Sequence, residues 1–198
     1  MSCWALIPFK GFDRGKSRLA TVLDSSERAA LNRELFDHVV QVLRQSPSID
    51  GVAVVSDSRA AREHARGLGL VVLEDAPESG GLADVVDDAL EELGRRGATR
   101  ALVCMSDLPD LSVEDIERVV RQLEESDVVL VPDLLHQGTN LVALQPPSVM
   151  ESCFGHEDSL MRHRARATEL GLTVCVQLLS GVSFDVDNPV DLERLRSR

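Results

Sequence analysis

Residues 6–19 read Leu6-Ile7-Pro8-Phe9-Lys10-Gly11-Phe12-Asp13-Arg14-Gly15-Lys16-Ser17-Arg18-Leu19. The apolar run before Lys10 predicts a buried first strand over residues 5–9, and the cationic segment after it predicts a loop. Four cations against one acid give this loop a local charge of +3, in a chain whose net charge is −12. Glycine lets a backbone approach a ligand closely, and Lys and Arg neutralise phosphate oxygens. The loop is therefore a candidate site for a phosphate-rich ligand.

The spacing within this loop matches neither of the common phosphate-binding motifs. Gly11 and Gly15 are four residues apart and Lys16-Ser17 follows, one residue short of the Walker A pattern G-x-x-x-x-G-K-[ST]. The pattern G-x-G-x-x-G does not fit either. On spacing alone, a solvated basic loop with glycines at its turns is the alternative.

Composition restricts the class of protein. At 198 residues, 43% apolar and 27% charged, the chain fits one globular domain over residues 1–198. The acidic balance argues against nucleic-acid and anionic-membrane partners. Neither a membrane-length apolar run nor a signal-peptide core is evident, so we expect a cytoplasmic protein. The four cysteines include no C-x-x-C pair, which argues against a zinc site.

Beyond the first strand, strand-length apolar runs alternate with segments of helical period. The alternation predicts an α/β fold with three layers, a mixed but mostly parallel sheet with helices on both faces. Shorter strands in the last third predict an antiparallel edge. Further strands are expected at residues 52–55, 70–73, 101–105, 128–131, 141–144 and 172–178. Helices are expected to begin near Asp24, Arg59, Leu82, Ser112, Ser159 and Asn188.

An acid follows the most apolar of these strands. Asp107 comes directly after the run that ends at Met105. In such sheets ligands bind outside the carboxyl ends of the strands, and Mg²⁺ takes one or two protein carboxylates together with phosphate oxygens. Asp107 is therefore a candidate metal ligand. The alternative is that it caps the Leu108-Pro109 turn.

A second acidic segment, Phe184-Asp185-Val186-Asp187, precedes the last helix. Residues two apart in an extended chain face the same way, so Asp185 and Asp187 would present two carboxylates to one point. This geometry suits a metal ion. The alternative is a pair of solvated acids ahead of a helix N-terminus, where negative charge is favoured.

Two glycine-containing segments and several histidines complete the candidate set. Ser79-Gly80-Gly81-Leu82 could cradle a nucleotide at the N-terminus of the helix that follows, or serve only as a loop. Gly138-Thr139-Asn140 offers a turn with two hydrogen-bonding side chains for an anion or carboxylate, although such residues are common in plain turns. His156 and His163 lack metal-like spacing and are expected at the surface.

Taken together and in order, these segments resemble a known family. The chain is similar to the 2-phospho-L-lactate / phosphoenolpyruvate guanylyltransferases of deazaflavin coenzyme F(420) biosynthesis, and the resemblance extends over nearly its whole length. It rests on Ile7-Pro8-Phe9-Lys10, Lys16-Ser17-Arg18-Leu19, Gly81-Leu82, Ser106-Asp107-Leu108-Pro109, Gly138-Thr139-Asn140, Phe154-Gly155 with Ser159 and Arg162-His163, and Asp185-Val186-Asp187-Asn188-Pro189.

The resemblance implies a nucleotidyltransferase fold of the GT-A-like, Rossmann-like type. It implies that GTP and a small phosphorylated three-carbon acid react and that pyrophosphate leaves. Because the attacking phosphate oxygen is already ionised at neutral pH, we expect that no general base is needed. The resemblance assigns Asp107, Asp185 and Asp187 to Mg²⁺ and places catalysis on Lys16 and Asp107. It assigns the nucleotide and the acid to two further sets. By the resemblance, the GTP phosphates would contact Lys10, Lys16 and Arg18, and the phospho-acid would contact Thr139, Gly155 and Ser159. The glycine-containing segments described above add Gly11, Gly80, Gly81 and Leu82 to the candidate GTP contacts and Asn140 to those of the acid.

Two departures from the family pattern leave alternatives open. Leu82-Ala83-Asp84 stands where the family continues Gly-Leu with Asn, and Gly155 and Ser159 are four residues apart rather than three. The acid could accordingly be phosphoenolpyruvate, 2-phospho-L-lactate or 3-phosphoglycerate. The alternatives are a molybdopterin or sugar-1-phosphate nucleotidyltransferase, and a catalytically silent GTP-binding protein. Whether the chain forms a homodimer, or passes its product to a downstream transferase, is open at this point.

Overall fold

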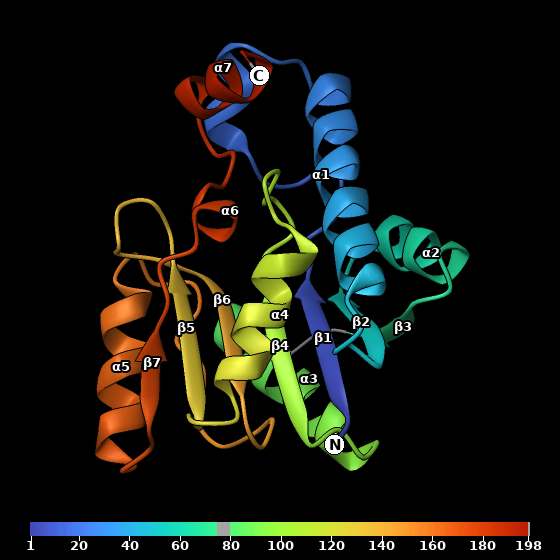
Figure 1. Ribbon diagram of the computed structural model, residues 1–198. Helices are drawn as coiled ribbons and strands as arrows, with labels where there is room; N and C mark the ends of the chain where they lie inside the picture. Colours follow the sequence, from blue (N-terminus) through green and yellow to red (C-terminus); the bar gives the residue numbers. More distant parts are fainter. Residues whose placement is uncertain (75–79, 198) are drawn as a thin grey trace.

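The computed structural model describes residues 1–74 and 80–197, and its centre is a seven-stranded sheet (Figure 1). The strand order is β3-β2-β1-β4-β6-β5-β7. The strands are β1 (Cys3–Pro8), β2 (Gly51–Ser56), β3 (Val71–Glu74), β4 (Arg100–Cys104), β5 (Val128–Pro132), β6 (Thr139–Leu144) and β7 (Val174–Val176). β6 runs antiparallel to both of its neighbours, whereas the other described pairs are parallel. The mostly parallel sheet predicted from the sequence is confirmed.

The predicted antiparallel edge is wrong. The antiparallel strand is β6, which lies inside the sheet between β4 and β5. A short turn over residues 133–138 reverses the chain after β5, and the returning strand pairs with β4 on its other side. The edge strand β7 pairs in parallel with β5 over only three residues, fewer than the predicted 172–178.

Helices cover both faces of the sheet, as predicted. α1 (Ser25–Gln45), α2 (Arg59–Gly67) and α4 (Val113–Gln122) pack on one face, and α3 (Leu82–Arg95) and α5 (Ser159–Glu169) pack on the other. Alternate residues of β1 enter the two cores, with Ile7 in the first and Leu6 in the second. This separation gives the three layers that the sequence pattern indicates.

The segment after β1 and the C-terminal helix pack together at the end of the sheet opposite the N-terminus (Figure 1). A short 3₁₀ helix, η1 (Ser17–Thr21), and the last helix, α7 (Pro189–Arg196), pack against the start of α1 (Figure 1). α6 (Ser180–Ser183) precedes the extended segment that leads to α7. This third core is formed by Leu19, Leu23, Leu35, Phe184, Val186 and Leu192. It brings the C-terminal acidic segment beside the N-terminal basic loop.

Helix starts follow the predicted capping residues. Asp24 and Glu27 form a reciprocal capping box on α1, and Asn188 and Asp191 form another on α7, with Pro189 in its first turn. Among the residues that the structure describes, none of the helices combines the length and the apolar content needed to cross a bilayer.

Candidate functional site

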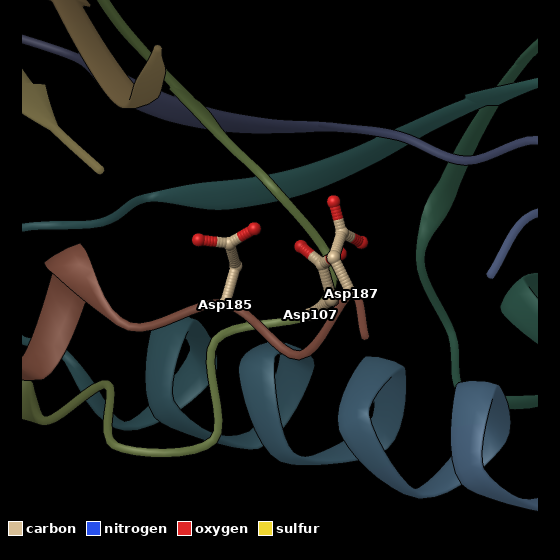
Figure 2. A group of neighbouring side chains, drawn as sticks. All are labelled: Asp107, Asp185 and Asp187. Atoms are coloured by element: carbon tan, nitrogen blue, oxygen red, sulfur yellow. The ribbon is translucent and has the colours of Figure 1, made fainter. Parts of the chain in front are cut away.

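Three carboxylates meet at the carboxyl end of the central strands. Asp107 lies in the loop after β4, and Asp185 and Asp187 lie in the extended segment between α6 and α7. One ligand oxygen from each lies within 4.8 Å of the others. Figure 2 shows the three side chains arriving from these two segments and pointing to the same side. Phe184 and Val186 are fully buried behind them, as the two-residue alternation predicts.

The carboxylates lie close enough to disfavour one another's charge. Burial raises the pKa of Asp185 to about 6, with further contributions from the charges of Asp107 and Asp187. Burial and Asp107 also raise the pKa of Asp187, while Lys16 and Arg18 act in the opposite direction. The fold therefore holds acids together against their repulsion, and a cation between them would relieve it.

We call Asp107, Asp185 and Asp187 the acid cluster, and Lys16 supplies one cation to it. Its side chain is 5% exposed, and Nζ lies 3.0 Å from Asp107 Oδ2 and 3.7 Å from Asp187 Oδ1. Nζ also donates to the carbonyl of Val186 at 2.5 Å. The backbone of Lys16 is left-handed, with φ of 49°, at the residue that precedes η1. The sequence placed Lys16 on the nucleotide phosphates and did not predict this contact with the acids.

The rest of the basic loop is held by contacts that the sequence did not reveal. Gly11 has φ of +112°, and a Cβ there would lie 2.8 Å from Ser58 Cβ, so the position requires glycine. The buried amide of Asn32 donates to the carbonyl of Phe12 at 2.9 Å. Arg14 forms a two-bond ion pair with Asp57. The loop is thus anchored on α1 and on the β2–α2 turn.

Lys10 and Arg18 are exposed on this anchored loop. Arg18 acts electrostatically on Asp187, which places its charge near the acid cluster. The loop therefore presents cations beside the carboxylates, as a site for a metal–phosphate ligand needs.

Asn140 is not a turn residue, contrary to the prediction for Gly138-Thr139-Asn140. It lies in β6, 6% exposed. Its Nδ2 donates to the carbonyls of Val182 at 2.9 Å and Ser183 at 3.3 Å, and to Asp185 Oδ1 at 3.3 Å. Asn140 thus ties the α6 turn to one carboxylate of the acid cluster.

Thr139 begins β6 and belongs to a second, uncharged group, also buried. Its Oγ1 lies 3.3 Å from Ser159 Oγ at the start of α5 and 3.2 Å from His163 Nδ1. The other ring nitrogen of His163 accepts the backbone N–H of Cys153 at 2.8 Å. We call Thr139, Ser159 and His163 the hydroxyl–imidazole cluster.

The predicted surface position of His163 is wrong, because the side chain is 0% exposed. Burial lowers the pKa of His163 to about 4, although the Ser159 carbonyl opposes that effect. His156 is exposed, as predicted. The burial of His163 could have been inferred from helical spacing, because one face of α5 is buried at Leu160, His163 and Ala167.

The glycine segments meet at the N-terminus of α3. Gly81 is the residue before this helix, and a Cβ on Gly155 would lie 3.6 Å from Leu82 Cβ. The predicted nucleotide segment and the predicted acid segment are therefore neighbours. Ser79 lies outside the described residues. The acid cluster and the hydroxyl–imidazole cluster are joined through the consecutive residues Thr139 and Asn140.

Comparison with solved structures gives the same fold. A crystal structure of a protein from Desulfovibrio desulfuricans G20 superposes with a TM-score of 0.81 at 20% identity, covering 98% of this chain and 87% of that chain. CMP:2-keto-3-deoxy-manno-octonic acid synthetase in complex with CTP superposes with a TM-score of 0.68 at 14% identity, covering 100% and 98%. The nucleotidyltransferase-like α/β fold expected from the sequence is confirmed.

Sequence relatives place the chain within this fold. A phosphoenolpyruvate guanylyltransferase from Sphaerobacter thermophilus is 36% identical over 98% of this chain and 93% of that protein. A 2-phospho-L-lactate guanylyltransferase from Methanothermobacter thermautotrophicus is 32% identical over 97% and 83%. The family model described as "Guanylyl transferase CofC like" matches residues 3–196. The chain therefore belongs to the CofC-like guanylyl transferase family.

Proposed function

We propose that this protein transfers GMP from GTP to a small phosphorylated three-carbon acid and releases pyrophosphate, in deazaflavin coenzyme F(420) biosynthesis. The observation that carries the proposal is the joining of Lys16 and three carboxylates beside an anchored cationic loop. Family membership and the names of the relatives support the choice of reaction. Phosphoenolpyruvate and 2-phospho-L-lactate are the first acids to consider, and 3-phosphoglycerate is the third.

The residues present suit a magnesium ion. Asp107, Asp185 and Asp187 would hold it, because they offer hard oxygen donors within 4.8 Å of one another and their mutual charge is unfavourable without a cation. When bound, Mg²⁺ would neutralise phosphate charge at this point. Asn140 would hold the Asp185 carboxylate in place.

The chain's own residues would act by positioning and by charge. Lys10 and Arg18 would hold the phosphates of GTP, and Lys16, whose ammonium group lies beside Asp107, would add positive charge where the phosphates meet the acids. Gly81 and Leu82 would place the nucleotide at the α3 N-terminus, and Gly155 beside them would leave room for the acid.

A phosphate oxygen of the acid would attack the α-phosphorus of GTP in line with the leaving group. The new P–O bond forms as the bond to the β-phosphate oxygen breaks, and pyrophosphate leaves with the electron pair. The attacking oxygen is ionised at neutral pH, so no side chain has to remove a proton. Rate enhancement would then come from orientation and electrostatic stabilisation.

The test is pyrophosphate release from the purified protein with GTP and Mg²⁺, adding phosphoenolpyruvate, 2-phospho-L-lactate and 3-phosphoglycerate in separate assays. Release with one acid establishes the reaction and identifies the substrate. ATP in place of GTP is the control for nucleotide choice, because Leu82-Ala83-Asp84 departs from the family pattern. GTP binding without release for any acid would favour a silent binder and would refute the proposal.

A further inference from the structure

His163 has a fixed proton arrangement in the hydroxyl–imidazole cluster. Its Nε2 accepts the backbone N–H of Cys153 at 2.8 Å, so Nε2 carries no hydrogen. The ring is fully buried, and burial keeps it neutral at physiological pH. A neutral imidazole has one N–H, and that hydrogen must therefore reside on Nδ1.

This arrangement determines which way the neighbouring hydroxyl donates. Nδ1 lies 3.2 Å from Thr139 Oγ1, and a protonated Nδ1 can donate to that oxygen but cannot accept from it. Thr139 therefore cannot use its own hydroxyl hydrogen on the histidine.

The hydrogen bond between Thr139 and Ser159 uses one of their two hydroxyl hydrogens. Their hydroxyl oxygens are 3.3 Å apart, so one hydroxyl donates to the other. The pair has two hydroxyl hydrogens and uses one between them. Ser159 Oγ donates to Thr139 Oγ1, so the hydrogen that is left is the one on Thr139, a residue that is 6% exposed against 3% for Ser159.

We propose that His163 is a positioning residue that makes the Thr139–Ser159 pair a net hydrogen-bond donor toward an ionised oxygen of the phospho-acid. An ionised phosphate or carboxylate can only accept, so it fits a site from which one donor points outward. With the other tautomer, Nδ1 would take the hydrogen of Thr139 and leave the pair without a free donor. This inference rests on the proposed function, since it assigns the acid to Thr139 and Ser159.

The first test is independent of turnover. Long-range proton–nitrogen NMR on the full-length protein at pH 7 should show the His163 ring with a protonated Nδ1 and an unprotonated Nε2, identified by loss of the signals in His163→Asn. The opposite tautomer, or a doubly protonated ring, would overturn the inference even if the enzyme is active.

The second test is a double-mutant cycle measured by acid-dependent pyrophosphate release. His163→Phe keeps a ring beside Phe154, whose ring centroid is 5.0 Å from that of His163. It should raise the KM for the acid about ten-fold, with the KM for GTP unchanged. In the Thr139→Val background the same substitution should change the KM for the acid less than about two-fold, because His163 acts through Thr139. His163→Asn, whose amide N–H can reach the Nδ1 position, should restore most of the affinity.

The outcomes separate the inference from the proposed function. If the wild-type protein releases no pyrophosphate with any acid, the proposed function fails, and the NMR result alone decides the inference. If the wild-type protein is active but His163→Phe raises the KM equally in both backgrounds, or raises the KM for GTP as much, His163 is only structural and the inference is wrong.

Discussion

The acid cluster and the hydroxyl–imidazole cluster contact neighbouring residues of β6, Asn140 and Thr139, but the first is charged and the second is neutral. Around Asn140 the side chains are charged, and burial raises the pKa of two acids. Around Thr139 the side chains are neutral, and in the hydrogen bonds of Thr139, Ser159 and His163 each donor meets an acceptor. The first group brings three carboxylates together, so we expect it to bind a cation, whereas we expect the second to offer one hydrogen-bond donor to the acid. Their ligands should therefore affect the protein in different ways.

The largest expected effect is the loss of one carboxylate from the acid cluster. Asp107→Asn should lower kcat by at least about 10³-fold, because it removes charge where the metal and phosphates meet. The measurement is pyrophosphate release with GTP and the active acid. Asp110→Asn, in the same loop, is the matched control and should remain active. Near-normal turnover of Asp107→Asn would remove Asp107 from the site.

The second prediction contrasts the responses of the two clusters to metal. Saturating Mg²⁺ should raise the melting temperature of the wild-type protein by roughly 5–10 °C, since it binds the folded acid cluster. Thr139→Val should keep this shift and Asp185→Asn should lose most of it. An equal shift in both variants, measured by differential scanning fluorimetry, would mean that the cation binds elsewhere.

The third prediction concerns pH in the presence of EDTA. The pKa of Asp185 is raised in the folded state, so the folded protein binds the extra proton between about pH 4 and 6. The contribution of Asp185 to stability therefore rises as the pH falls through this range and is lost above about pH 6. Asp185→Asn should be more stable than the wild type at pH 7.5, by up to about 2 kcal/mol, and the advantage should shrink at pH 4.5. A constant difference in free energy of unfolding would contradict the assigned cause.

The fourth prediction tests whether the hydroxyl–imidazole cluster binds the acid and not GTP. Thr139→Val should raise the KM for the phospho-acid about ten-fold and leave the KM for GTP unchanged, because it removes one hydrogen bond to an ionised group. Thr139→Ser keeps the hydroxyl and is the control. If the KM for GTP rises in parallel, the two clusters do not bind separate ligands.

The smallest effect is expected at the exposed edge of the basic loop. Lys10→Ala should raise the KM for GTP by roughly two- to five-fold at low salt, and the difference should diminish near 0.5 M salt because exposed charges are screened. Lys10→Arg keeps the charge and should behave as the wild type. An effect that does not change with salt would point to a local structural role.

The proximity of the acids could be predicted from the sequence, whereas the contacts of the neutral side chains could not. Asp107 was found because a strand end has a known place in a parallel sheet, and Asp185 because a two-residue alternation is local. The helical spacing on α5 could have indicated that His163 is buried, but its partner Thr139 is 24 residues away, and the partner of Asn32 is 20 residues away, so no local pattern encodes these contacts. The internal place of β6 was missed for a related reason, since a hairpin signals antiparallel pairing but not which further strand the returning strand joins.

The packing of α7 against η1 has a consequence for the order in which the protein becomes competent during its synthesis. The contact between Lys16 and Val186 joins residues 170 positions apart, so the acid cluster cannot assemble until nearly the whole chain has left the ribosome. The strands β1 to β4, by contrast, can pair earlier. A chain released before Asp185 would contain all seven strands of the described sheet but only one of the three carboxylates of the acid cluster. We expect chains that end there to be inactive rather than partly active.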